Sequence, residues 1–525
     1  MRKIETQAVT IRNKAKVVTI LSFLFHLIIS YSASQAQNDA SSWQMFGRGV
    51  DRNMVSSMQS VSLDFDIADG ERVKFRKDLG SQTYANPVVV DGKIFVGANN
   101  DSKYRDNHEG DRGCLICFDA ETGDFLWQLT REKLPQGRIN DWPYQGICST
   151  PHVVSDRLYV VTNRCEIMCL DVNGFRDGKN DGLVQDEVDQ TEFDADIIWS
   201  VDMIAEYGVF PHNLATSSPL VYEDKVYLLT SNGVGEDLIE VPAADAPSFL
   251  CLNRDDGSLV WSAKPENRIL HGQWNSPAFG IVDGVPQIYF PGGDGWLYAY
   301  HAETGDLIWK CDLNPKETVW QVAGRGTRNY TVATPVFFEN SVVIGVGQEP
   351  EAGEGVAYLW RIDATKSGDI SEEIGEYGKP GSANPNSGII WRYGGIDVDG
   401  AITGRKNEPI FRRTISTVAI DGELVFAADM VGFLHCIDLQ TGTRCWADDM
   451  LTTIWGSPLL VDGKVFIGNE DGLLVVYEAS REGPTMLKQF ETGGASIYST
   501  PTFVNGMMYL TDRNSLYAVE VSSDE

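Results

Sequence analysis

One phrase recurs along this chain and constrains its fold more than any other feature. Each copy starts with Ser, Thr or Asn before a proline, continues with a β-branched run and a turn, and ends at an Asp followed by Thr-Gly-x-x-x-Trp. The clearest copy runs from Asn275 to Trp309, with Ser276-Pro277 at its start and Thr304-Gly305 near its end. Repeats that hold about four short strands each are typical of β-propeller blades.

The number of copies predicts the number of blades. Seven copies open with a proline, and an eighth, Ser416-Thr417-Val418, has lost it; the prolines are Pro87, Pro151, Pro219, Pro277, Pro335, Pro458 and Pro501. The last copy stops at Leu516–Val521 without a fourth strand, and Asp69–Phe75, upstream of the first copy, resembles the missing one. We therefore expect an all-β, eight-bladed propeller over residues 37–523, in which an N-terminal strand closes the ring and removes the exposed edge.

The first 36 residues have the order of a secretory signal peptide. Basic residues between Arg2 and Lys16 precede an apolar run, Val17–Tyr31, and small residues flank Gln35 before the predicted cleavage after Ala36. The alternative is an uncleaved membrane anchor, although the apolar run is short for a membrane-spanning helix. We expect a periplasmic or secreted protein that is not stably inserted in a membrane once the signal peptide is removed.

The charge balance limits the classes of partner. The chain has 43 basic and 74 acidic residues, which gives a formal net charge of -31. Such a surface repels nucleic acid and anionic lipid. We therefore expect no nucleic-acid partner, and we expect the propeller to be a monomer.

Most of the nine cysteines fit a structural role. Cys117, Cys169, Cys251 and Cys436 all occupy the same repeat position, where two other copies have alanine. A position that accepts alanine or cysteine is a small slot in the core. Cys114 and Cys117 have the spacing of a redox or metal pair, but residues three apart on a strand point to opposite faces.

Together these features resemble the PQQ-like (pyrroloquinoline-quinone-type) propeller repeat. Quinoprotein alcohol dehydrogenases and the outer-membrane assembly factor BamB share this repeat, and the resemblance covers about Trp43 to Val521. It implies the fold more than the function, because enzymes and scaffolds share it. The chain lacks the adjacent cysteine pair and the haem-attachment motif found among the dehydrogenases. It also lacks a lipid-anchor cysteine near the predicted cleavage site.

In a propeller, the loops that precede each opening phrase converge on one rim of the axial funnel. In this chain those loops carry aromatic, histidine and arginine side chains, and the candidate ligand-binding residues are Trp142, His212, Trp274, Arg325, Arg328, Arg412 and Trp455. Arginine binds carboxylates bidentately, and tryptophan offers a stacking face. This combination would suit a flat polyanion such as PQQ, or an acidic peptide. The alternative is that these side chains plug the channel.

Two acidic loops are candidate carboxylate sites. The insertion after Asp171 alternates Asp, Asn and Gly, a pattern typical of loops that wrap calcium, with Asp171, Asn173, Asp177 and Asp181 as candidate ligands. The alternative for this insertion is a solvated acidic loop. Glu349, Glu351 and Glu354, with Gln348, form a second acidic cluster that could face the funnel and supply a carboxylate for calcium or for a catalytic base.

The sequence leaves three functions open. The first is an exported binding or assembly scaffold for a protein, a peptide or a small anionic ligand. The second is a PQQ- and calcium-dependent dehydrogenase that oxidises an alcohol or a sugar. The third is a glycan-binding propeller that uses the rim aromatics. The sequence does not decide whether the protein is an enzyme.

Overall fold

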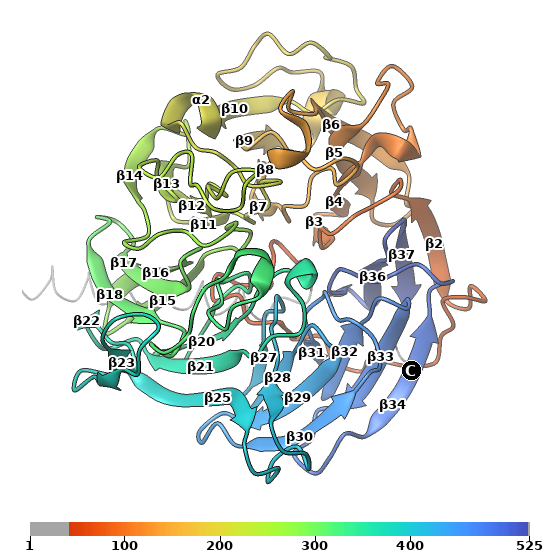
Figure 1. Cartoon of the computed structure of the whole chain (residues 1–525). Coiled ribbons are helices and arrows are strands. Elements are labelled where there is room, and N and C mark those ends of the chain that lie inside the picture. The colour runs from red at the N-terminus through yellow and green to blue at the C-terminus, as the bar shows by residue number, and fades with distance from the viewer. Residues whose placement is uncertain (1–40, 523–525) are drawn as a thin grey trace, which may run out of the picture.

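Eight sheets stand in a ring around a central axis (Figure 1). The structure is a computed structural model, and it describes residues 41–522. Each sheet contains four antiparallel strands that run outwards from the axis, two sheets add a short parallel strand, and the colour sequence in Figure 1 passes around the ring in chain order. This arrangement confirms the predicted eight-bladed, all-β propeller.

The first four blades, each given from the axis outwards, have the following strands. Blade 1 contains β3 (Val88–Val90), β4 (Lys93–Asn99), β5 (Arg112–Asp119) and β6 (Phe125–Glu132). Blade 2 contains β7 (His152–Val154), β8 (Arg157–Val161), β9 (Glu166–Asp171) and β10 (Ile197–Asp202). Blade 3 contains β11 (Leu220–Tyr222), β12 (Lys225–Leu229), β13 (Phe249–Asn253) and β14 (Leu259–Ala263). Blade 4 contains β15 (Ala278–Val282), β16 (Val285–Pro291), β17 (Trp296–His301), β18 (Leu307–Asp312) and the parallel β22 (Gly368–Asp369).

The other four blades complete the ring. Blade 5 contains β19 (Val336–Phe338), β20 (Ser341–Val346), β21 (Tyr358–Asp363), β25 (Ile389–Asp397) and β26 (Glu408–Phe411). Blade 6 contains β27 (Ala419–Asp421), β28 (Leu424–Ala428), β29 (Phe433–Asp438) and β30 (Arg444–Asp449). Blade 7 contains β31 (Leu459–Val461), β32 (Lys464–Gly468), β33 (Leu473–Glu478) and β34 (Met486–Glu491). Blade 8 contains β35 (Thr502–Val504), β36 (Met507–Thr511), β37 (Ser515–Glu520) and β2 (Val73–Asp78).

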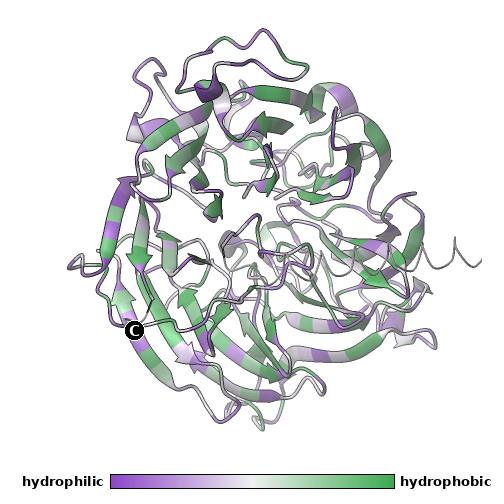
Figure 2. Cartoon of the chain, turned by 180° about the vertical axis from the view of Figure 1, so that it is seen from behind, coloured by the Kyte–Doolittle hydropathy of each residue, from purple (hydrophilic) through white to green (hydrophobic). Residues whose placement is uncertain are grey.

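The described residues outside the blades form little regular structure. They include β1 (Val55–Ser56), the small hairpin of β23 (Glu373–Ile374) and β24 (Ser382–Ala383), and the short helix α2 (Met203–Tyr207). Hydrophobic residues dominate the inner strands, whereas hydrophilic residues alternate with them along the outermost strands (Figure 2). No helix within residues 41–522 is long and apolar enough to cross a bilayer. The predicted signal peptide, residues 1–36, lies outside the described residues.

The ring closes between the two ends of the propeller, as predicted. Strand β2 pairs antiparallel with β37, and Phe75 lies opposite Ala518. In Figure 1 this pair places the start of the coloured chain beside its end. The N-terminal strand therefore covers the edge that the last blade would otherwise expose.

The residue before each opening proline links neighbouring blades. Its side-chain oxygen accepts a hydrogen bond from the backbone N–H of its counterpart one blade earlier. The N–H of Asn86 donates to Thr150 Oγ1 at 3.1 Å, and the N–H of Thr500 donates to Asn86 Oδ1 at 2.8 Å. The same link joins Thr150 to Ser218, Ser218 to Ser276, Ser276 to Thr334, Thr417 to Ser457 and Ser457 to Thr500. These residues form an axial ring of polar side chains, which accounts for the repeated Ser, Thr or Asn.

The Thr-Gly-x-x-x-Trp end of each copy also joins blades. Trp261 Nε1 donates to the carbonyl of Ala302 in the next blade at 2.8 Å, and its ring packs against Gly305 of the Thr-Gly turn. Gly305 has φ +73°, and a Cβ there would lie 2.7 Å from the Trp261 ring. The glycine is therefore needed both for its backbone conformation and for the close approach of the tryptophan.

A segment before the first blade threads the ring from the inside. We call residues 43–56 the axial strap. Its backbone bonds to the innermost strands in order around the axis: Trp43 pairs with Val89, and later residues of the strap accept bonds from the N–H groups of Val153, Phe279, Phe337 and Leu460. The last residues of the strap form β1, which runs parallel to β31.

Arg52 fixes the middle of the axial strap. Its guanidinium is fully buried and donates to the carbonyls of Pro277 at 2.8 Å and Ser218 at 2.9 Å, as well as to Phe46 of the strap itself. Nothing in the repeat pattern marks this segment, because it belongs to no blade. The strap ties blades together around the axis, and it brings Phe46 to the axial cavity.

The cysteines lie where the repeat predicted. Cys117, Cys169, Cys251 and Cys436 are buried, and all nine cysteines, which fall within the described residues, are free thiols. Burial raises the pKa of Cys114 to about 12, which leaves this thiol protonated and unreactive at neutral pH. The Cys114–Cys117 pair is therefore a core feature in this structure.

Candidate functional site

The axis opens into a cavity of about 720 Å³. Its lining includes the whole axial ring of Asn, Ser and Thr residues defined above, so every blade contributes to it. Loops that precede the opening phrases supply most of the remaining wall, together with Phe46 from the axial strap. The fold therefore gathers side chains from distant parts of the sequence around one site.

One side of the cavity is aromatic. Tyr84 and Tyr498 stack with their ring centroids 4.9 Å apart, and the Trp455 ring lies 5.0 Å from Tyr498. Trp142 also lines the cavity, beside Asn213, and the exposed guanidinium of Arg138 lies over it, with its central carbon 4.0 Å from the ring centroid. Arginine and tryptophan attract each other in this geometry, which holds the guanidinium at the mouth.

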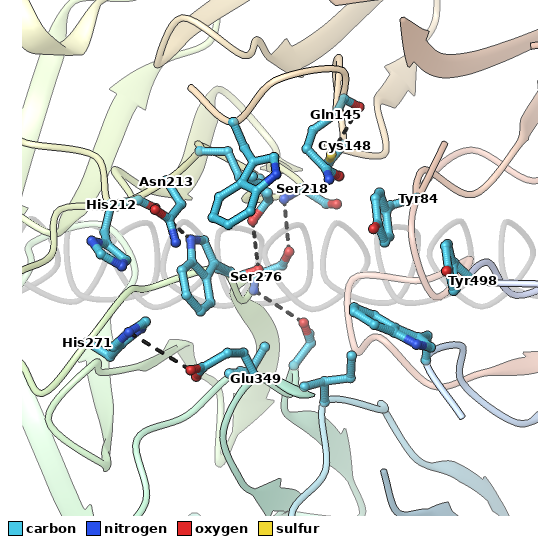
Figure 3. Close-up of a pocket in the computed structure, with 18 of the residues that line it drawn as sticks. Tyr84, Gln145, Cys148, His212, Asn213, Ser218, His271, Ser276, Glu349 and Tyr498 are labelled. Atoms are coloured by element: carbon cyan, nitrogen blue, oxygen red, sulfur yellow. Dashed lines mark hydrogen bonds and ion pairs between the residues drawn. The ribbon is translucent and has the colours of Figure 1, made fainter. Parts of the chain in front are cut away.

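The opposite side is polar (Figure 3). His212 and His271 meet edge to face with centroids 4.5 Å apart, and Trp274 lies against both rings. Glu349 Oε1 is 3.9 Å from His271 Nε2. Figure 3 shows these three labelled side chains on one side of the cavity, with Tyr84 and Tyr498 on the other.

Burial controls the protonation of these groups. Desolvation, reinforced by the neighbouring His212, lowers the pKa of His271 to about 3, and desolvation also lowers the pKa of His212. Both imidazoles are therefore neutral at physiological pH. Desolvation raises the pKa of Glu349 to about 7, with a contribution from Glu351, so this carboxyl is only partly ionised at neutral pH.

Four of the seven predicted ligand-binding residues meet at this cavity. Trp142, His212, Trp274 and Trp455 line it, although they come from different blades. The four residues came from loops that precede an opening phrase. Of the second acidic cluster, Glu349 and Glu351 line the cavity, whereas Gln348 and Glu354 do not.

The three predicted arginines do not line the cavity. Arg325 is exposed at the end of the 3-10 turn η4 (Val322–Gly324). Arg412 lies over the Phe433 ring and within 3.6 Å of Glu408. Arg412 is thus engaged by contacts outside the cavity, and Arg325 is exposed to solvent.

Arg328 is held inside the protein wall. Its guanidinium donates to Asp312 at 2.9 Å, and Lys316 Nζ contacts the same carboxylate at 2.7 Å. The Tyr377 ring covers the guanidinium at 4.2 Å. Arg328 thus shares a buried carboxylate with Lys316, and its guanidinium is engaged inside the wall.

The neighbouring Arg413 is also committed to the wall. Its guanidinium donates to the carbonyls of Gly324 and Gly326, both at 2.8 Å, and to that of Ala352. Gly324 belongs to η4, and Ala352 ends the 3-10 turn η5 (Pro350–Ala352). Arg413 therefore fastens together the two loops that form this part of the rim.

The cavity consequently has the opposite charge from the one predicted. Its lining holds the carboxyl groups of Glu236, Glu349 and Glu351, and Arg138 is its one guanidinium among the described residues. PQQ is a tricarboxylate, so these residues fit it poorly because three carboxyl groups oppose its charge. PQQ binding stays a prediction that a titration can test.

The predicted calcium ligands have partners within the protein. Asp171 ends β9 and pairs with Arg157 at 2.7 Å, and Asp177 pairs with Lys179 at 3.1 Å. Within residues 41–522, no group of three or more His, Cys, Asp or Glu side chains is arranged to hold a metal ion. Asn173 and Asp181 follow in the same loop, where the Asp181 N–H donates to Asp196. Calcium binding here stays a prediction.

Several lining residues were not identified from the sequence. The axial ring was visible as a repeated position, but its role in forming the cavity was not. Glu236 and Leu238 come from an insertion after β12, and Phe46 comes from the axial strap. No local pattern marks Phe46, because its place depends on how the strap crosses the whole ring.

Comparisons with known proteins agree with this architecture. The family described as "Outer membrane protein assembly factor BamB" matches residues 191–377 and 381–485, which is more than half of the chain. The chain is 23% identical to the outer membrane protein assembly factor BamB of Xanthomonas campestris over 303 residues, covering 47% of this chain and 69% of the relative. It is 22% identical to that of Moranella endobia over 410 residues, covering 75% and 85%.

A solved structure shows the same fold. The quinohemoprotein alcohol dehydrogenase of Comamonas testosteroni superposes with a TM-score of 0.57 at 14% sequence identity, covering 94% of this chain and 84% of the other. At this identity the likeness concerns the fold alone. Together, the eight repeats and the family match show that the chain belongs to the outer membrane protein assembly factor BamB family of PQQ-like repeat propellers.

Proposed function

We propose that this protein is an exported scaffold that holds a segment of a partner protein in its axial cavity. The observation that carries the proposal is the convergence of all eight blades on one cavity, with aromatic faces on one side and hydrogen-bonding groups on the other. Cavities of this kind, mostly apolar with a few convergent polar groups, are the usual sites of ligand binding.

Family membership supports a protein partner. The relatives are named as assembly factors for outer membrane proteins. A scaffold with that role works where the signal peptide would deliver it, in the periplasm. The negative charge of the chain, -31, keeps such a surface away from anionic lipid and nucleic acid.

The dehydrogenase alternative has less support. It rests on a fold similarity at 14% identity, and Arg328 and Arg413, which could balance a quinone tricarboxylate, are engaged in the wall. The cavity therefore favours a binding role over a quinone-dependent one. A glycan remains a weaker candidate, since aromatic faces also stack on sugars.

Selection from a displayed library of random dodecapeptides tests the proposal. The purified protein is the target, and a Trp274→Ala/Trp455→Ala variant provides the counter-selection, because both residues line the cavity. The control variant Trp320→Ala removes a tryptophan that stacks under Arg268 outside the cavity. We expect enriched peptides to share a motif and to bind the wild type and the control at least about tenfold more tightly than the double variant. Equal enrichment on the double variant, or no shared motif, would rule out the cavity as a peptide site.

A further inference from the structure

The polar side of the axial cavity has acceptor groups that the fold leaves unpaired. His212 is 1% exposed, and its Nδ1 lies 2.8 Å from the carbonyl of Val234. A carbonyl only accepts, so Nδ1 carries the proton and Nε2 presents a lone pair. Nε2 has no hydrogen-bond partner, although it is buried at the cavity wall. An unsatisfied buried acceptor is costly, and a ligand that donates a hydrogen bond there removes this cost.

Glu349 presents a second unpaired acceptor on the same side. Its Oε2 is buried without a partner, and its Oε1 is 3.9 Å from His271 Nε2, which is beyond hydrogen-bond distance. Arg413 acts on this carboxyl electrostatically, but its guanidinium is engaged with the carbonyls of Gly324 and Gly326. The carboxyl group therefore sits in a poorly solvated place, and no arginine or lysine donates a hydrogen bond to it among the described residues.

The rest of the lining favours positive charge as well. Trp274 and Trp455 line the cavity, and an aromatic face attracts a cation when water is excluded. Trp142 lines it as well, but the guanidinium of Arg138 already lies over its ring at 4.0 Å. Glu236 and Glu351 add negative charge nearer to solvent. A cleft with charge of one sign concentrates ions of the other sign.

One group on the aromatic side needs the opposite kind of partner. Trp455 Nε1 is buried and donates to nothing, and indole nitrogen can only donate. An acceptor such as a peptide carbonyl, placed across the cavity from the cation, would satisfy it. A simple amine has no such acceptor, so this pair of requirements favours a cation carried on a peptide.

We propose that the axial cavity binds a peptide through a basic side chain, with the guanidinium or ammonium group between His212, Glu349 and the tryptophan faces. This inference rests on the proposed function and names its ligand chemistry. In this arrangement the side chain donates to His212 Nε2 and Glu349 Oε2, while a backbone carbonyl of the peptide accepts from Trp455 Nε1. The partner segment is therefore basic, the reverse of the anionic ligand expected from the sequence.

Calorimetric titration with capped pentapeptides tests the chemistry. The probe is acetyl-Ala-Ala-Arg-Ala-Ala-amide, and its counterparts replace the central Arg with Lys, with citrulline as the neutral isostere, or with Glu. We expect the Arg and Lys peptides to bind at least about tenfold more tightly than the citrulline peptide, and the Glu peptide to be weakest. Agmatine, which carries a guanidinium but no peptide, tests whether the cation must belong to a peptide. If agmatine bound as tightly as the Arg peptide, the peptide assignment would be wrong.

Matched variants locate the contact. Glu349→Gln should weaken the Arg peptide about tenfold and leave the citrulline peptide nearly unchanged. Glu354→Gln changes an exposed carboxylate of the same loop that does not line the cavity, and it should have no effect. Trp455→Phe keeps an aromatic face but removes the donor, so it should weaken both peptides equally. If Glu349→Gln fails to fold, two other results still test the proposal. They are the effect of Trp455→Phe and the ratio of the affinities of the wild type for the Arg and citrulline peptides.

Acidity gives a further readout. Between pH 6 and 8 Glu349 loses its proton, so the affinity for the Arg peptide should rise up to about tenfold in the wild type and stay flat in Glu349→Gln. The other groups that face Glu349 are Glu351, Arg413 and His271, and His271 stays neutral across this range.

The possible failures are distinguishable. If the citrulline or Glu peptide binds as tightly as the Arg peptide and the Trp274→Ala/Trp455→Ala variant loses this binding, the cation inference is wrong while the peptide-binding function stands. If none of the peptides binds and the library selection also yields no motif, the proposed function itself is wrong. Tight binding of a neutral oligosaccharide in place of all peptides would likewise overturn both.

Discussion

Arg328 donates a hydrogen bond to Asp312 across 2.9 Å, and both side chains are buried. This contact explains why a rim that is rich in arginine in the sequence encloses a cavity that is acidic in the structure. The guanidinium of Arg328 is engaged within the wall, so it does not line the cavity. The charge of the cavity therefore depends on which charged side chains the fold has already paired elsewhere.

Replacement of Arg328 should therefore affect stability. Arg328→Ala removes a buried side chain with its hydrogen bonds to Asp312 and to the Asp294 carbonyl, while Lys316 still pairs with Asp312, and we expect a loss of about 3 kcal/mol in the free energy of unfolding. Arg325→Ala, an exposed neighbour, should change it by less than about 0.5 kcal/mol. Urea denaturation measures both; equal effects of the two variants would contradict the buried cluster.

The N-terminal segments should be required for a stable ring. A chain that starts at Ser81 lacks the axial strap and β2, which exposes β37 as an edge strand and removes the buried contacts of Arg52. We expect its melting temperature to fall by more than about 10 °C. The matched control starts at Ser41 and keeps all of these contacts. If both chains melt together, neither the strap nor β2 closes the propeller.

The Thr-Gly turn should tolerate no side chain. Gly305 has φ +73°, and Gly305→Ala places a methyl group 2.7 Å from the Trp261 ring. We therefore expect the free energy of unfolding to fall by about 3 kcal/mol. Gly284→Ala is the control, because it has a similar φ, +81°, with open space around its Cβ. It should lose only about 1 kcal/mol. A thermal melt in which the control loses as much as Gly305→Ala would show that the tryptophan contact is unimportant.

Glu349 should make the fold less stable as the pH rises. Its folded pKa, about 7, is higher than its ordinary value of 4.5, so the folded state holds the proton more tightly than the unfolded state between these values. Its stabilising contribution is complete below pH 4.5 and is lost as the pH rises to 7. The free energy of unfolding of Glu349→Gln, compared with that of the wild type, should rise by about 2 kcal/mol between pH 5 and pH 8. A pH-independent difference in stability between the two proteins would contradict the raised pKa.

The predicted calcium loop has a direct thermal test. If calcium binds there, it should raise the melting temperature of the wild type, because a ligand that binds only the folded state stabilises it. The Asp177→Ala/Asp181→Ala variant should show no such rise. An identical rise in both proteins would place the ion elsewhere, and no rise in the wild type would remove the site.

The fold was largely predictable because the repeat encodes contacts between blades. The residue before each proline forms the axial ring, and Trp261 needs the glycine of the next blade, so these positions recur whatever the function. Even the closing strand could be recognised near Phe75, since the last copy lacks one strand.

The site was only half predictable. The loop positions correctly brought Trp142, His212, Trp274 and Trp455 to the cavity. Side-chain direction could not be deduced, because it depends on partners that are distant in the sequence or on another element. Arg413 turns into the carbonyls of two separate loops, and Phe46 arrives on a strap that belongs to no repeat.

The most direct test of the central claim is a competition measured in one calorimeter cell. The protein is titrated first with PQQ in the presence of calcium and then with the capped Arg pentapeptide. An acidic, aromatic cavity predicts no heat from PQQ at protein concentrations well above micromolar, followed by saturable one-to-one binding of the peptide that Trp455→Ala abolishes. Tight one-to-one binding of PQQ that is lost in Trp455→Ala, with no heat from the peptide, would contradict the account and favour a quinoprotein.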